Sequence, residues 1–134
     1  MIISKDIKFD CAHMLSQYEG KCANLHGHTY HGTVTIEGDP YFRVRGMVLD
    51  YNEIKKAVDK YDHAVIFSSV EFRNEAEADL LDWALKHGMR IVILAFGKST
   101  AETLAQEIAE SFGCYGKVTV RLSETDGSWA EAHA

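Results

Sequence analysis

The stretch HGHTYHGTVTIE, residues 26–37, alternates between two sets of side chains that belong on opposite faces of an extended chain. The first set is His26, His28, Tyr30, Gly32, Val34 and Ile36; the second is Thr29, His31, Thr33, Thr35 and Glu37. A period of two residues is typical of a β-strand with one buried face. The predicted buried face begins with two histidines, which indicates a site at that end of the strand.

A second alternating stretch supplies another histidine on a matching face. In residues 2–13, one face carries Ile3, Ile7, Phe9, Cys11 and His13. If the two strands pair antiparallel, His13 lies beside His26 and His28. Three imidazoles suit Zn²⁺ and leave the fourth tetrahedral position open, as in catalytic zinc sites. His31 has the opposite parity, so we exclude it as a ligand.

The rest of the chain predicts helices alternating with strands. Helices are expected near 51–61, 75–87 and 101–112, and strands over 89–96 (MRIVILAF, a buried strand) and 117–124. The second helix is expected to bury Leu80, Leu81, Trp83, Ala84 and Leu85. Ser99 and Glu102 resemble a capping box for the third helix. This order predicts an α+β fold with helices on one face of a sheet.

Composition favours a single domain over residues 1–134 and argues against two classes of partner. The net charge of −6 disfavours a nucleic-acid binder, and the sequence contains neither a secretion signal nor an apolar run long enough for a membrane span. Three irregularly spaced cysteines argue against a disulfide framework, so we expect reduced thiols and a cytoplasmic protein.

Four further residues carry possible chemistry. Cys22 lies in a polar loop beside Lys21, where it is either a base or nucleophile near the metal or the fourth ligand of a closed, structural zinc site. Asp62 and His63 form either an acid–base pair or an ordinary helix end. Glu124 continues the apolar face of the last strand, where it is either solvated or a bidentate anchor for a guanidinium-like ring edge.

Six motifs in this order resemble the 6-pyruvoyl-tetrahydropterin synthase family. They are FDCAH (9–13), CANLHGH (22–28), GMVLDYNEIK (46–55), YDHAVIF (61–67), STAETLAQEI (99–108) and VRLSETDGSWAEA (120–132). The Cys-x3-His-Gly-His spacing is similar to the bacterial branch that makes 6-carboxy-tetrahydropterin for queuosine biosynthesis. The resemblance leaves out about 68–98, which adds a helix and a strand relative to compact members.

The resemblance implies the tunnelling fold, a four-stranded antiparallel sheet with helices on one side. It also implies a homohexamer with sites between subunits, acting on a small-molecule pterin. Zinc would be held by His13, His26 and His28; Cys22 would be the general base, and Asp62 and His63 its partner acid–base pair. Glu124, with Thr100 nearby, would hold the pterin edge.

The reaction implied for the family branch is the zinc-dependent conversion of 7,8-dihydroneopterin triphosphate to 6-carboxy-tetrahydropterin, with release of acetaldehyde and triphosphate. One alternative is a triphosphate lyase that keeps the three-carbon side chain, as in 6-pyruvoyl-tetrahydropterin synthase. The other is a non-catalytic protein that binds zinc or a pterin.

Overall fold

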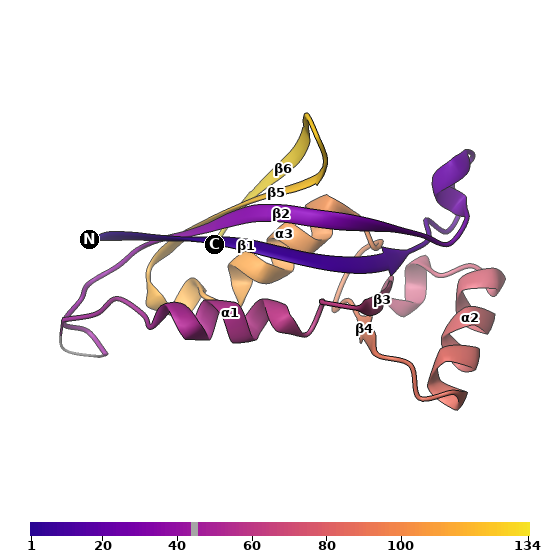
Figure 1. Cartoon of the computed structure of the whole chain (residues 1–134), viewed down its shortest axis with the longest axis horizontal. Helices are drawn as coiled ribbons and strands as arrows, with labels where there is room; N and C mark the ends of the chain where they lie inside the picture. The colour runs from indigo at the N-terminus through magenta and orange to yellow at the C-terminus, as the bar shows by residue number, and fades with distance from the viewer. Residues whose placement is uncertain (44–45) are drawn as a thin grey trace.

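Strands and helices alternate along the computed structural model, which describes residues 1–43 and 46–134 (Figure 1). Within that part of the chain the strands are β1 (Ile2–His13), β2 (His26–Glu37), β3 (Ala64–Phe67), β4 (Ile91–Ile93), β5 (Lys117–Thr125) and β6 (Ser128–His133). The α-helices are α1 (Tyr51–Asp59), α2 (Glu75–Lys86) and α3 (Ala101–Glu110). Short 3-10 helices cover Lys21–Ala23, Val70–Phe72 and Gly113–Tyr115.

The sheet has six strands in the order β4-β3-β1-β2-β5-β6, and this corrects the expected four-stranded antiparallel sheet. β1, β2, β5 and β6 do pair antiparallel, but β3 pairs parallel with β1, and β4 pairs parallel with β3. Ala64, Ile66 and Phe67 of β3 are buried, so this short apolar segment gains core packing by extending the sheet. The result is a mixed α+β architecture.

Helices α1 and α3 pack against one face of the sheet, as expected (Figure 1). The alternating strands direct Phe9, Tyr30, Val34, Val120 and Leu122 into that layer, where they meet buried residues of the helices: Ile54, Val58, Leu104, Ala105 and Ile108. Phe9 and Tyr30 stack with ring centroids 5.2 Å apart. Among the described residues, no helix is long and apolar enough to cross a bilayer.

The segment between β3 and α3 differs from the prediction in two ways. The expected buried strand over 89–96 forms only the three-residue β4, where Ile93 is 46% exposed while Leu94, just beyond it, is buried. Helix α2 lies beyond the ends of the long strands and buries Glu77, Leu81 and Ala84, whereas Trp83 and Leu85 face solvent (Figure 1). The helix therefore presents a carboxyl group to the interior in place of two large apolar side chains.

The cap of α3 also lies one residue later than predicted. Thr100 is the N-cap, and its side chain accepts a hydrogen bond from the Thr103 N–H. Ser99 precedes the cap, and its N–H, carbonyl and hydroxyl groups form hydrogen bonds outside the helix. These groups reach the site described next.

Candidate metal centre and active site

Three imidazoles converge on the helix-covered face of the sheet. The antiparallel register sets His13 directly opposite His26, and Cys11 opposite His28, so that the three rings share one face as the alternation predicts. The Nε2 atoms of His13 and His26 are 3.1 Å apart, and one ligand nitrogen from each histidine lies within 4.8 Å of the others. A tetrahedral zinc ion requires nitrogens about 3.3 Å apart, given Zn–N bonds of about 2.0–2.1 Å.

Hydrogen bonds orient two of the rings in the way that metal ligation requires. His13 Nδ1 is bonded to the Ser99 carbonyl, and His26 Nδ1 to the Asn24 carbonyl at 2.7 Å. Because a carbonyl only accepts, each Nδ1 carries the proton and each Nε2 presents its lone pair to the cluster. Sequence reasoning missed both partners, because a backbone carbonyl leaves no residue-type signal.

The third ring has a buried nitrogen without a hydrogen bond. Within the described chain, His28 Nε2 is the buried side-chain nitrogen or oxygen that has no such partner. Burial is the main cause that lowers the pKa of both His13 and His28, which favours the neutral, metal-binding form of each ring. An unpaired buried nitrogen aimed at two other imidazole nitrogens fits a divalent cation of the zinc type.

Glu124 lies against the same cluster. Its Oε1 is 3.4 Å from His13 Nε2 and 3.3 Å from His28 Nε2, and it accepts a hydrogen bond of 3.1 Å from the Tyr30 hydroxyl. The residue continues the inward face of β5, as the alternation predicts, and remains partly exposed.

A hollow of about 100 Å³ is lined by Glu124, Trp129 and the first residues of α3. Thr100 does not line this hollow; it caps the adjoining helix. The structure therefore brings Glu124 to the candidate metal cluster and leaves Thr100 one residue away from the lining.

The Cys22 thiol is not part of the metal cluster in the described chain. Cys22 is half-buried in the 3-10 helix Lys21–Ala23, and its carbonyl accepts a hydrogen bond of 2.8 Å from the Leu15 N–H, two residues after His13. This contact ties the loop to the end of β1 that carries the first histidine. The described chain therefore holds the Cys22 loop near the cluster through the backbone, without bringing the thiol into it.

Asp62 and His63 form a dyad at a different surface. Asp62 Oδ2 is 2.9 Å from His63 Nδ1, a contact made possible by the left-handed backbone of His63, at φ 58°. Asp62 Oδ1 accepts from the Asp10 N–H at 2.9 Å; this hydrogen bond, and then His63, lower the pKa of the carboxyl group.

The His63 ring is 78% exposed and borders a groove of about 450 Å³ that Cys11 and His28 line, together with three outward residues: Asp10, Ala12 and Thr29. By strand parity those three residues belong to the sheet face opposite His13. The dyad therefore borders a groove formed mostly by residues of the face opposite the imidazole rings, and His28 is the member of the cluster that also lines it.

The mixed sheet, the helices on one face and the histidine cluster define a tunnelling-fold protein with a candidate metal centre. Residues 2–134 match the family described as 6-pyruvoyl tetrahydropterin synthase, and the chain belongs to that family.

Relatives and solved structures agree with this assignment. A Haemophilus influenzae protein named 6-carboxy-5,6,7,8-tetrahydropterin synthase is 35% identical over 139 residues, covering 96% of each chain. A Pyrococcus abyssi protein provisionally given the same name is 35% identical over 134 residues, covering 92% of this chain and 84% of that one. A Plasmodium falciparum 6-pyruvoyl tetrahydropterin synthase structure shares the fold, with a TM-score of 0.64 and 21% identity, covering 100% of this chain and 97% of that one.

Proposed function

We propose that this protein is a 6-carboxy-5,6,7,8-tetrahydropterin synthase that converts 7,8-dihydroneopterin triphosphate to 6-carboxy-tetrahydropterin with release of acetaldehyde and triphosphate. The observation that carries the proposal is the convergence of three imidazoles, one of them with an unpaired buried nitrogen, in a chain whose relatives have that name. Zinc is the proposed metal because three nitrogen ligands with an open fourth position are its catalytic arrangement.

Each candidate residue has a role in this proposal. His13, His26 and His28 hold the zinc ion, which when bound acts as a Lewis acid that lowers the pKa of substrate hydroxyls. The Cys22 thiolate removes the C1′ proton, and His63, oriented by Asp62, relays protons during side-chain rearrangement. Glu124 accepts hydrogen bonds from the 2-amino group and N3 of the pterin, with Thr100 nearby.

The separation of the two groups of residues supports a shared active site. The His63 ring borders the groove and is not part of the imidazole cluster, so the dyad of a second copy would complete the site. We propose a homohexamer in which neighbouring copies supply these two parts, acting in the cytoplasm in queuosine biosynthesis. A heterologous interface of this kind closes into a ring.

The direct test is to incubate the zinc-loaded protein with 7,8-dihydroneopterin triphosphate and identify the products. Acetaldehyde together with 6-carboxy-tetrahydropterin is the expected result. A 6-pyruvoyl product without acetaldehyde would assign the chain to the alternative lyase reaction. Zinc binding without turnover would indicate a non-catalytic protein.

The role of Cys22 is tested by Cys22→Ala, with Cys114→Ala as a matched control because Cys114 is an exposed free cysteine outside the site. We expect Cys22→Ala to retain zinc and to lose at least about a hundredfold in turnover, the scale of a missing general base. Cys114→Ala should keep both properties. Loss of zinc together with unfolding in Cys22→Ala would support a fourth-ligand role instead.

A further inference from the structure

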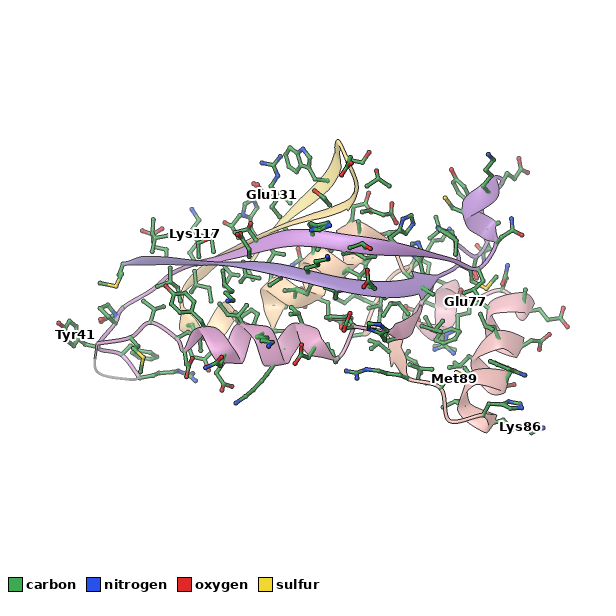
Figure 2. The ribbon with its side chains drawn as sticks, viewed as in Figure 1. Tyr41, Glu77, Lys86, Met89, Lys117 and Glu131 are labelled. Atoms are coloured by element: carbon green, nitrogen blue, oxygen red, sulfur yellow. The ribbon has the colours of Figure 1, made fainter. Side chains whose placement is uncertain are left out.

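Glu77 of α2 is a fully buried carboxyl group that is not among the candidate reacting residues (Figure 2). Among the described residues it forms no ion pair with a lysine, arginine or histidine. Burying a carboxyl group without a cation is costly unless hydrogen bonds satisfy its oxygens. The hydrogen bonds that Glu77 accepts therefore indicate its structural role.

Both oxygens of Glu77 bind groups outside its own helix. Oε1 accepts from the Ser68 N–H at 2.6 Å, at the residue that follows β3, and Oε2 accepts from the Ser16 hydroxyl, in the loop that follows β1. Glu77 occupies the third position of α2, where a glutamate ordinarily reaches back to the N-cap N–H. Here Ser16 Oγ accepts from the N-cap Asn74 N–H at 3.1 Å, which frees the carboxyl group to connect the ends of two strands.

Hydrogen bonds continue from Ser68 to a candidate metal ligand. Ser68 Oγ accepts from the Ser99 N–H at 3.1 Å, and the Ser99 carbonyl accepts from His13 Nδ1. The Ser99 hydroxyl donates to the Met14 carbonyl at 3.1 Å, which holds Ser99 against the residue after His13. Ser68, Ser99 and His13 are all buried, so water does not compete for these bonds.

We propose that Glu77 is a positioning residue for the metal centre, acting through Ser68 and the backbone of Ser99 to fix the rotation and tautomer of His13. This inference rests on the proposed metal site. It gives a function to α2, which lies outside the motifs that carry the family resemblance. Groups that orient a ligating histidine commonly contribute about 10- to 100-fold to metal affinity.

The test measures zinc affinity by competition with a chromophoric chelator for wild type, Glu77→Ala, Ser68→Ala and a matched control. Glu107→Ala is the control, because Glu107 also accepts from a backbone N–H, that of Ala95 at 3.0 Å, and from a buried tyrosine hydroxyl, with no hydrogen bond to Ser99 or His13. We expect about tenfold weaker zinc binding in Glu77→Ala and Ser68→Ala. The control should stay within about twofold of wild type, as for independent sites.

Two further measurements separate positioning from general destabilisation. Glu77→Gln retains an oxygen to accept from Ser68 N–H and an amide that can donate to Ser16 Oγ, so it should restore most of the affinity. In the Co²⁺-loaded protein, the visible absorption bands should change in Ser68→Ala and remain unchanged in Glu107→Ala, because they report ligand geometry.

Equal losses of zinc affinity in Glu107→Ala and Glu77→Ala would overturn the inference. Unchanged zinc affinity in Ser68→Ala would also overturn it, because this variant keeps the contacts of Glu77 and removes only the hydroxyl group that binds Ser99. If the wild-type protein itself fails to bind zinc, the proposed metal site is wrong. If it binds zinc and the variants match it, only the positioning role is wrong.

Discussion

Replacing His28 with phenylalanine should move the stability of the metal-free and zinc-loaded proteins in opposite directions. His28 Nε2 is buried without a hydrogen bond in the described chain, and the ring packs edge-on against Tyr30 with centroids 5.8 Å apart. Phenylalanine keeps the aromatic ring and removes the unpaired nitrogen. The substitution therefore relieves a desolvation cost in the absence of metal and deletes a ligand in its presence.

The expected magnitudes follow from these two effects. An unsatisfied buried polar group costs about 1–3 kcal/mol, and the partial exposure of His28 favours the lower end of that range. A gain of about 1 kcal/mol raises the Tm of a chain of this size by about 3–4 °C. Zinc at a hundred times its Kd stabilises the wild-type fold by about 2.7 kcal/mol, which corresponds to about 10 °C.

The assay is thermal unfolding at pH 8, where imidazoles are neutral, with and without zinc and at one protein concentration. His31→Phe is the matched control, because His31 lies on the same strand but on the opposite, exposed face. The control should keep the full zinc-dependent rise in Tm, and His28→Phe should lose it. A zinc-dependent rise that survives in His28→Phe would refute the assignment of this histidine as a ligand.

Three other measurements probe the dyad, the backbone and the proposed pterin anchor. The pKa of Asp62 is lowered from 3.8, mainly by a backbone hydrogen bond, so its stabilising contribution is complete above about pH 4 and is lost as the pH falls through the folded-state pKa. In urea unfolding, the difference in unfolding free energy between wild type and Asp62→Asn should therefore disappear over that range. A difference that stays constant with pH would contradict this cause. Gly116→Ala should cost about 1–3 kcal/mol in urea unfolding, because the new Cβ would overlap the Glu37 carbonyl oxygen. Gly113→Ala has room for the Cβ and should be nearly neutral. Glu124→Gln should raise KM about 10- to 100-fold with zinc retained; loss of zinc would make Glu124 a ligand.

The alternating strands were predictable from the sequence because their burial is periodic. The parity of residues 2–13 and 26–37 places His13 beside His26 in the structure, and the parity of 117–124 directs Glu124 inward. Each of these strands is long enough that period-two alternation stands out against chance. The three-histidine cluster was therefore accessible without coordinates.

The shorter elements were not predictable for a physical reason. β3 has four residues and β6 is an edge strand with mostly exposed side chains, so both depend on a neighbouring strand for their conformation. The buried stripe of α2 was misassigned because apolar character suggested Trp83 and Leu85. The spacing of Glu77, Leu81 and Ala84 is the helical signal that identifies the inward face.

The exclusion of His63 from the imidazole cluster has a genetic consequence in the proposed homohexamer. Two variants, His28→Phe and His63→Ala, should each be inactive alone, yet each retains the part that the other lacks. When they are mixed at random in equal amounts in one assembly, about a quarter of the interfaces should join two intact halves. Inactive alleles of this gene would then complement one another within a single cell.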